Sequence, residues 1–265
     1  MGGFMDFSDK TVLVTGAGTG IGRAIAVAFF EKGARVMISG RTANTLEETA
    51  SMMQPSDSGR CAVCAADMRV INDLEKLVQE TDRRFGPIDI LVNNAGIYPN
   101  KRVVDMEPEE WDAVMETNLR GPFLLCRTVA KQMIEKGTRG KIVNITSGAH
   151  RSARKGAAHY ASSKAALTML TKVLALELSE YGINVNTVSP GLIDVGPQMP
   201  VTQEYKDSLV KMIPWQRMGR PDEIAKAVLF IASEDAEYIT GESLEVDGGG
   251  GAGRYFLPLS DPRET

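Results

Sequence analysis

Three residues in the second half of the chain are of the types that move protons. Tyr160 and Lys164 lie four positions apart in a stretch with few helix breakers, so a helix would place both side chains on one face. Ser147 ends an apolar run that is predicted to be a strand. An ammonium near a phenol, whose ordinary pKa is about 10, favours the phenolate. With a serine hydroxyl to hold the oxygen, such a group would protonate or deprotonate a carbonyl or alcohol oxygen.

An ordinary helical surface often carries the same Tyr-x3-Lys pair, so its meaning depends on the rest of the chain. The 265 residues are 43% hydrophobic and 24% charged, a globular composition. The net charge of −4 and the pI near 5.4 do not favour binding to nucleic acid or to an anionic membrane. The longest apolar run, 24–30, is too short to span a bilayer, and the first ten residues lack the segments of a signal peptide. We therefore expect a soluble, cytoplasmic protein.

The cysteines do not indicate a disulfide framework or a metal site. Cys61 and Cys64 form a CxxC motif inside a predicted strand, where an odd spacing places them on opposite faces. A redox CxxC usually lies at a helix N-terminus. We expect all three thiols, including Cys126, to be buried small side chains, and we predict no metal site.

Short apolar strands alternate with longer amphipathic segments along the whole chain. This alternation predicts an α/β fold: one doubly wound Rossmann-type domain over residues 1–265, with a parallel seven-stranded sheet and helices on both faces. The expected strands are 11–15, 35–39, 61–65, 88–92, 141–145, 184–188 and 243–246. The expected helices are 43–53, 70–85, 109–136, 157–181 and 222–233. The segment 192–219 and the tail 254–265 are the expected exceptions to compactness.

A glycine-rich turn follows the first expected strand. Gly16, Gly20 and Gly22 have the spacing G-x3-G-x-G and precede an apolar helix. Glycines at such a turn allow the backbone to approach a pyrophosphate at the helix N-terminus. The turn therefore indicates a dinucleotide.

The residues after the second and third strands bear on which dinucleotide binds. A fold that takes NAD usually has an acid after the second strand, whereas this chain has Gly40 and Arg41. Because Arg41 can pair with a 2′-phosphate, NADP(H) is favoured and NAD(H) remains possible; alternatively, Arg41 stacks on adenine or faces solvent. Asp67 is placed either to bind an adenine amine or to cap the next helix.

Two asparagine positions complete the pattern. In the run that follows the fourth strand, Asn94, Ala95 and Gly96 would let a ribose lie against the backbone, and an asparagine side chain there can tie neighbouring loops together. Asn118 falls within an expected helix, where asparagine has no intrinsic advantage. It is expected to hold a water molecule or a kink.

Taken together, these motifs resemble the short-chain dehydrogenase/reductase family in its compact form, including its 3-ketoacyl reductase-like members. The matches are TGAGTGIG, Asp67, NNAG, Asn118, Ser147, Tyr160 with Lys164, SPG at 189–191 and ITGESLEVDGG, in family order over residues 11–249. The resemblance implies a catalytic tetrad of Asn118, Ser147, Tyr160 and Lys164. It also implies cofactor contacts from Gly16, Thr19, Gly20, Ile21, Gly22, Arg41, Asp67, Met68, Asn94, Ala95, Gly96, Tyr160, Lys164, Pro190, Gly191, Ile193 and Val195.

The resemblance also implies roles. Tyr160 would protonate the carbonyl oxygen as the nicotinamide delivers hydride, and Ser147 would hold that oxygen. Lys164 would bind the nicotinamide ribose and lower the pKa of Tyr160, while Asn118 would position a water molecule in a proton relay. The family usually forms homotetramers, with 109–136 and 157–181 at one interface and the C-terminal region at another.

Two departures from the family pattern stand out. Val195 occupies a position where the family often has a threonine that contacts the nicotinamide carboxamide. Bacterial fatty-acid ketoreductases dock acyl carrier protein with arginines that match Thr138 and Tyr181 here, which weakens a carrier-protein interpretation, although Lys136 and Arg139 could substitute in part.

Substrate selectivity is expected from 148–159 and 192–219. The second segment carries Met199, Met212, Ile213 and Trp215 and is either a lid over an apolar pocket or a packing element. Basic residues near the tyrosine either attract an anionic substrate or are solvated; they are His150, Arg151, Arg154, Lys155 and His159. The sequence thus predicts an NADP(H)-preferring oxidoreductase for a small ketone or secondary alcohol. The alternatives are an NAD-dependent alcohol dehydrogenase and a catalytically silent cofactor-binding sensor or scaffold.

Overall fold

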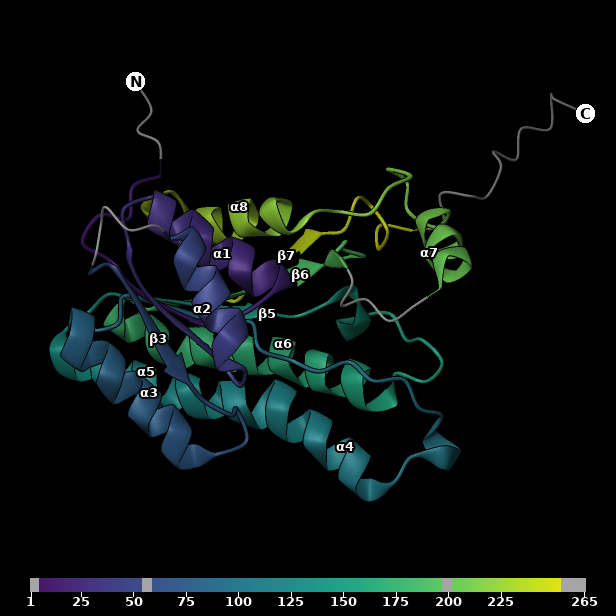
Figure 1. Ribbon diagram of the computed structural model, residues 1–265, viewed down its shortest axis with the longest axis horizontal. Helices are drawn as coiled ribbons and strands as arrows, with labels where there is room; N and C mark the ends of the chain where they lie inside the picture. The colour runs from purple at the N-terminus through teal and green to yellow at the C-terminus, as the bar shows by residue number, and fades with distance from the viewer. Residues whose placement is uncertain (1–4, 54–58, 197–201, 254–265) are drawn as a thin grey trace, which may run out of the picture.

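The computed structural model describes residues 5–53, 59–196 and 202–253, and these contain one parallel sheet of seven strands in the order β3-β2-β1-β4-β5-β6-β7 (Figure 1). The predicted Rossmann-type α/β fold is therefore confirmed. The strands are β1 (Thr11–Thr15), β2 (Arg35–Gly40), β3 (Cys61–Ala65), β4 (Ile90–Asn93), β5 (Lys141–Ile145), β6 (Asn184–Pro190) and β7 (Ser243–Val246).

Helices cover both faces of this sheet. The helices are α1 (Gly20–Glu31), α2 (Ala43–Met52), α3 (Ile71–Phe85), α4 (Pro108–Met115), α5 (Gly121–Lys136), α6 (Ala158–Leu178), α7 (Gln203–Val210) and α8 (Pro221–Ala232). In Figure 1, α1, α2 and α8 lie on one side of the sheet and α3, α5 and α6 on the other, while α7 lies apart at the right.

The alternation of side chains along each strand builds two cores. In β1, Val12 and Val14 face the core that α1 and α8 cover, whereas Leu13 faces the core under α3, α5 and α6. All three side chains are fully buried. Both faces of the strand are therefore apolar, as expected for a parallel sheet between two helical layers.

The expected helix 109–136 is interrupted in the structure. Residues Glu116–Arg120 form a π-helical turn between α4 and α5. Pro122 lacks the N–H that would bond the carbonyl of Asn118 in a regular α-helix, so the hydrogen-bond ladder cannot continue unchanged. The π turn includes Asn118, and a kink held by this residue, one expectation for it, stays a prediction. Smaller differences occur at β4, which begins two residues later than expected, and at β6, which continues to Pro190.

The expectation that all three cysteines are buried is wrong for two of them. Cys126 is buried, but Cys61 and Cys64 are half-buried. They lie in β3, which stands at one end of the strand order of the described sheet and pairs there with β2. Their predicted placement on opposite faces is confirmed, because Cys61 packs against the α1–α8 core and Cys64 against the other.

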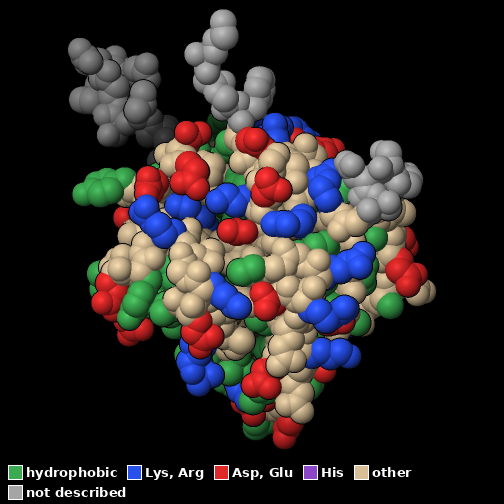
Figure 2. All heavy atoms as spheres, turned by 90° about the vertical axis from the view of Figure 1, so that its left-hand side faces the viewer, with side chains coloured by type: hydrophobic (Ala, Val, Ile, Leu, Met, Phe, Trp, Pro, Cys, Tyr) green, Lys and Arg blue, Asp and Glu red, His purple; other side chains and the backbone are tan. Residues whose placement is uncertain are grey.

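Charged side chains of both signs are interspersed on the side of the molecule turned away from α7 (Figure 2). No basic patch dominates this face, in keeping with the net charge of −4. Among the described residues, no helix combines the length and the apolar character needed to cross a membrane.

Candidate active site

The predicted site residues meet at the carboxyl ends of the strands. The chain leaves β1 toward β2 and β3, and later passes from β4 toward β5, β6 and β7, although β1 and β4 are neighbours. In open parallel sheets, ligands bind in the crevice at such a switch point. The glycine turn, the Asn94–Gly96 loop, Ser147 and Pro190 all follow or end strands at this edge.

Backbone groups enclose the glycine turn after β1. Gly16 has a φ of +64°, and a Cβ on Gly22 would lie 2.2 Å from the carbonyl oxygen of Gly16. Asn94 Nδ2 donates to the carbonyl oxygens of Thr15 and Gly16 at 3.0 and 3.1 Å. The expectation that an asparagine ties neighbouring loops together is therefore confirmed, and only glycine fits at position 22.

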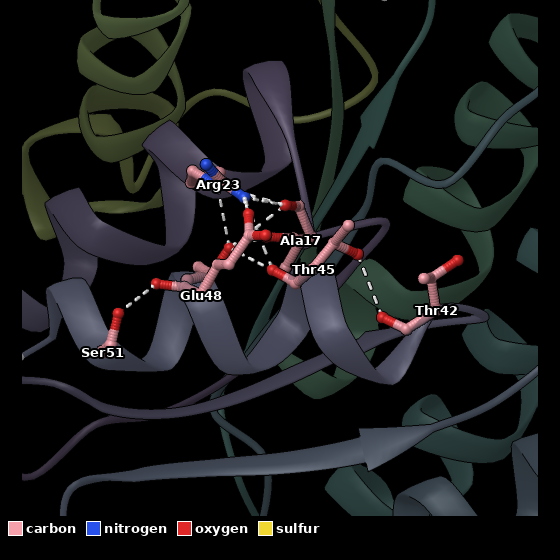
Figure 3. A network of polar contacts seen from close by, with 8 residues as sticks. Ala17, Arg23, Thr42, Thr45, Glu48 and Ser51 are labelled. Atoms are coloured by element: carbon pink, nitrogen blue, oxygen red, sulfur yellow. Dashed lines mark hydrogen bonds and ion pairs between the residues drawn. The ribbon is translucent and has the colours of Figure 1, made fainter.

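Helix α2 holds the same turn from outside (Figure 3). Arg23 of α1 donates to the carbonyl oxygen of Gly18 at 3.1 Å and pairs with Glu48 at 2.9 Å. Thr49 Oγ1, which is buried, donates to the carbonyl oxygen of Ala17 at 3.0 Å. The sequence analysis did not identify Arg23, Glu48 or Thr49, because α2 is distant along the chain and only the fold brings it to the turn.

The N-terminus of α1 is open to an anion. Its N-cap, Thr19, makes no side-chain cap hydrogen bond, and its first turn holds no acidic residue. Free N–H groups and the helix dipole at such an end attract phosphate. Together with the room that Gly16, Gly20 and Gly22 leave, this end fits the pyrophosphate of a dinucleotide.

Arg41 and Asp67, the two residues expected near the adenosine, differ in whether their charges are paired. Arg41 is exposed just after β2, and within the described ranges its side chain has no hydrogen bond or ion pair. The Asp67 carboxylate pairs with Arg69 at 2.7 Å, and the hydrogen bond from Arg69 lowers the pKa of Asp67. Asp67 does not cap α3, whose N-cap is Val70, so the capping alternative is wrong.

Lys164 is buried beside the loop after β4. Its side chain is only 4% exposed, and Nζ donates to the carbonyl oxygen of Ile145 at 2.8 Å. Burial lowers the pKa of Lys164 to about 8. A Cβ on Gly96 would lie 3.7 Å from Lys164 Nζ and 3.3 Å from Asn118 Oδ1, so Gly96 lies against both polar groups.

Tyr160 lies on the same helix, with its ring centroid 5.9 Å from Lys164 Nζ. Burial raises the pKa of Tyr160, while a hydrogen bond with Ser147 and the charge of Arg154 lower it. The pKa of the phenol is therefore raised overall, contrary to the expectation that Lys164 would lower it. The physical reason is that burial outweighs the favourable groups, and the ammonium itself is directed to a backbone carbonyl.

Asn118 joins three elements. Its Oδ1 accepts from Ile97 N–H and its Nδ2 donates to the Ile97 carbonyl oxygen, both at 2.8 Å. Nδ2 also lies 3.3 Å from Ser163 Oγ on α6. The amide thus holds the loop after β4 against the π turn and α6, and its role in holding a water molecule stays a prediction.

The cofactor contacts expected after β6 are anchored in the body. Gly191 N–H donates to the carbonyl oxygen of Val246 at 3.0 Å, and a Cβ on Gly191 would lie 2.7 Å from Asp247. Ile193 is buried and Val195 packs against the α1–α8 core. Met68, another expected cofactor contact, is buried as well and lies against Gly121 of α5.

The segment 192–219 combines packed and exposed residues. Ile213 is buried, whereas Met212 is 53% and Trp215 67% exposed. Met199 lies outside the described residues. The packing alternative thus holds for Ile213, and the lid interpretation stays open for Met212 and Trp215.

Most of the basic residues near Tyr160 are already engaged. His150 Nε2 lies 2.9 Å from Glu245 Oε1, and Arg151 pairs with Glu245 and Asp247, each at 3.1 Å. His159 is fully buried, and its burial lowers its pKa. The cluster therefore does not act as one basic patch.

Comparison with known proteins agrees with this arrangement. A family model described as enoyl-(acyl carrier protein) reductase matches residues 16–250. The NAD-dependent glycerol dehydrogenase of Listeria innocua is 39% identical over 92% of this chain and 94% of that protein. The 3-oxoacyl-[acyl-carrier-protein] reductase FabG of Escherichia coli is 38% identical over 92% of this chain and 98% of its own length.

One solved structure of similar fold is a complex with a nicotinamide cofactor. A variant of actinorhodin polyketide ketoreductase with NADPH superposes with a TM-score of 0.85 at 34% identity, over 91% of this chain and 97% of that one. The matches extend over nearly the whole sheet and the motifs at its carboxyl edge. The chain therefore belongs to the short-chain dehydrogenase/reductase family and is an oxidoreductase that acts on CH–OH or ketone groups.

Proposed function

We propose that this protein interconverts a ketone and a secondary alcohol with NADP(H), and that Tyr160 is its proton donor and acceptor. One observation carries the proposal: Tyr160 shares α6 with buried Lys164, its ring centroid lies 5.9 Å from Lys164 Nζ, and Ser147 lowers its pKa, at the sheet edge where the glycine turn follows β1. A proton-transfer group and a dinucleotide-binding turn at one edge suit hydride transfer to a carbonyl.

Different residues of the chain would bind the cofactor, hold the substrate oxygen and transfer the proton. The N-terminus of α1 would hold the pyrophosphate, and Asn94–Gly96, Pro190, Gly191, Ile193 and Val195 would flank the nicotinamide ribose and ring. When bound, the nicotinamide supplies hydride to the carbonyl carbon in reduction and accepts it in oxidation. Ser147 donates a hydrogen bond to the substrate oxygen, and Tyr160 donates its proton to the same oxygen.

Lys164 is suited to return that proton. With a pKa of about 8, its ammonium can give up a proton near neutral pH, which an exposed lysine cannot. Asn118 is held by Ile97 and lies with Lys164 against Gly96, which suits the positioning of a water molecule between the lysine and solvent.

The test of this chemistry is cofactor oxidation measured over a broad panel of ketones. Turnover of at least one ketone class is expected. Tight NADPH binding without any turnover would instead favour a cofactor-binding sensor or scaffold, the alternative that the complete tetrad argues against.

The preference for NADP(H) rests on Arg41. Its guanidinium is exposed and makes no ion pair at contact distance among the described residues, although its charge helps to lower the pKa of Asp67, and Gly40 offers no acid for a ribose 2′-hydroxyl. NADPH accompanies one structural neighbour, whereas one relative is named as NAD-dependent.

The preference is measured as kcat/KM with NADPH divided by kcat/KM with NADH. Arg41→Ala is expected to lower this ratio by about tenfold to a hundredfold, because it removes a charge-assisted contact to phosphate. Arg84→Ala, which removes an exposed arginine from α3, is the control and should leave the ratio unchanged. A wild-type preference for NADH would refute the role of Arg41.

We also propose that the protein is a homotetramer with α5 and α6 at one interface. Large apolar side chains are exposed on these two helices: Phe123, Ile134, Met169, Val173 and Leu176, with Leu176 80% exposed. Contiguous exposed apolar surface marks association sites. Light scattering after size-exclusion chromatography tests this, and a Met169→Lys, Leu176→Glu double variant should dissociate the assembly. A monomeric wild type would refute it.

A further inference from the structure

The basic side chains around Tyr160 differ in how their charges are compensated. His150 and Arg151 belong to a cluster with Glu245 and Asp247 at the end of β7, with contacts of 2.9 to 3.1 Å. Those carboxylates leave little positive charge for a ligand, since each basic side chain there already has an anionic partner.

Arg154 is in a different situation. Among the described residues its side chain has one partner, the hydroxyl of Tyr205, to which Nη1 donates at 2.9 Å. That partner is neutral, so no carboxylate in the described ranges 5–53, 59–196 and 202–253 pairs with Arg154. The charge reaches the reaction centre, because it lowers the pKa of Tyr160 against the effect of burial.

The backbone around Arg154 is fixed by the fold. Its carbonyl oxygen accepts from Ala157 N–H at 3.2 Å, in the turn that leads into α6. The next residues are tied to the loop after β4, since Lys101 N–H donates to the Gly156 carbonyl oxygen at 2.9 Å. The guanidinium is therefore carried on a braced turn that precedes Tyr160 closely in the chain.

Tyr205 comes from a part of the chain that follows α6 and β6. It lies in the first turn of α7, where its N–H donates to the N-cap hydroxyl of Thr202 at 3.2 Å. The Arg154–Tyr205 hydrogen bond thus connects the turn before α6 with the 192–219 segment. Both side chains remain accessible, and Tyr205 is 37% exposed.

We propose that Arg154, assisted by Tyr205, binds a carboxylate of the substrate, so that the enzyme acts on an oxo acid and the corresponding hydroxy acid. A guanidinium presents five N–H donors in a planar fork that matches the two oxygens of a carboxylate, and Tyr205 occupies one of them. A tyrosine hydroxyl can donate to the same carboxylate after a small rotation. One cation with no carboxylate partner in the described ranges suits a single negative charge.

This inference rests on the proposed ketone–alcohol chemistry, in which the carboxylate itself is not changed. Hydride adds to the ketone carbon, Tyr160 protonates its oxygen, and the carboxylate only orients the molecule. The gain would be that binding energy far from the reacting carbon positions the carbonyl against Ser147 and Tyr160.

The experiment compares straight-chain oxo acids, differing in the distance between carbonyl and carboxylate, with their methyl esters. The readout is the ratio of kcat/KM for acid to kcat/KM for ester, measured with the full-length protein and saturating NADPH or NADH. The wild type is expected to prefer at least one acid. Arg154→Gln should lower that ratio by about tenfold to a hundredfold, and Tyr205→Phe by a smaller factor of about threefold.

Two further variants separate charge from geometry. Arg154→Lys keeps the charge without the fork and should retain part of the acid preference. Lys155→Gln removes the neighbouring exposed cation and should leave the ratio at the wild-type value. Equal loss in Lys155→Gln and Arg154→Gln would mean that general electrostatic attraction, and not a site at Arg154, selects acids, which overturns the proposal.

A second measurement does not depend on turnover. Calorimetry with protein saturated with NADP⁺ follows binding of each oxo acid of the panel, which cannot be reduced by the oxidised cofactor, and Arg154→Gln should weaken binding of the tightest of them by about tenfold to a hundredfold. Reduction of ketones and esters without any acid preference would overturn the carboxylate site and leave the proposed function intact. Arg154-dependent acid binding without turnover of any ketone would overturn the proposed function and support the carboxylate site.

Discussion

The turn after β1 is closely surrounded by backbone and side chains, whereas the segment around α7 exposes large side chains. A Cβ on Gly18 would lie 2.4 Å from Thr45 Oγ1, and one on Gly22 would lie 2.2 Å from a backbone oxygen. In the segment that follows α7, Met212 and Trp215 are 53% and 67% exposed. The glycine turn is therefore closely packed, whereas Met212 and Trp215, which follow α7, are largely accessible to solvent.

On the proposed function, this difference would separate the end of the site that holds the cofactor from the end that selects the substrate. The cofactor end is set by backbone geometry, which tolerates no added atoms. On the proposed function, the substrate end would be built from side chains on loops and on the short helix α7, where substitutions need not alter the sheet. Substitutions at the two ends are therefore expected to have different consequences.

The largest effect on activity is expected from a substitution of Tyr160. Tyr160→Phe removes the transferred proton and should lower kcat by about a thousandfold, within the range for loss of a general acid. Because the ring remains in place, the dissociation constant for NADPH, measured by fluorescence titration, should stay within about twofold of wild type. Retention of most of the activity would show that another group supplies the proton.

A substitution in the glycine turn after β1 should lower both the stability of the fold and the affinity for the cofactor. Gly22→Ala forces a methyl group against the Gly16 carbonyl oxygen, and overpacking of this kind costs about 1–3 kcal/mol. We expect a Tm lower by several degrees and a much weaker affinity for NADPH. Gly253→Ala, where a Cβ would meet no atom within 4 Å, is the control. Unchanged NADPH affinity in Gly22→Ala would show that the close packing of the glycine turn does not govern cofactor binding.

The buried lysine should make stability depend on pH. Between about pH 8 and 10.5 the unfolded chain holds a proton on Lys164 that the folded chain has released, so the free energy of unfolding should rise with pH across that window. Across this window the free energy of unfolding should rise by about 3 kcal/mol in total, because the pKa of Lys164 is lowered from 10.5 to about 8.

The comparison with Lys164→Met isolates this contribution. Burial raises the pKa of Cys61 to about 11 and of Cys126 to about 12, which opposes the trend above pH 9 in both proteins alike. Urea unfolding of wild type and variant at about pH 7 to 10 measures the difference. A difference that does not vary with pH would mean that Lys164 titrates normally.

The smallest effect on stability is expected at Trp215, in the exposed segment that follows α7. Trp215→Ala removes a largely exposed side chain, so Tm should change by less than about 1–2 °C, as is usual for surface positions. KM for apolar ketones should rise a few-fold if the indole contacts substrate. A large loss of Tm would place Trp215 in the packing of the body, and Ile213→Ala serves as the buried comparison.

Much of the architecture follows from local patterns. Strands with apolar residues on both faces, such as β1, and amphipathic helices between them are sufficient for a doubly wound parallel sheet. The motif order is sufficient to place Ser147, Tyr160 and Lys164 at one edge. At Asn118 the sequence indicated a kink as one alternative but not a π turn over Glu116–Arg120, because the Asn118–Ile97 pairing that stabilises it spans 21 residues.

By itself, the sequence determined the sheet and the glycine turn, because these depend on periodicity and on short spacings, and its resemblance to a family predicted the tetrad. Only the tertiary structure decided which charges are compensated. Arg151 and Arg154 look equivalent in the sequence, yet one meets Glu245 and Asp247 and the other meets only the hydroxyl of Tyr205 among the described residues. Likewise, burial of Tyr160 outweighs its favourable neighbours and raises its pKa. Desolvation and charge pairing are sums over residues far apart in the chain, so no local pattern contains them.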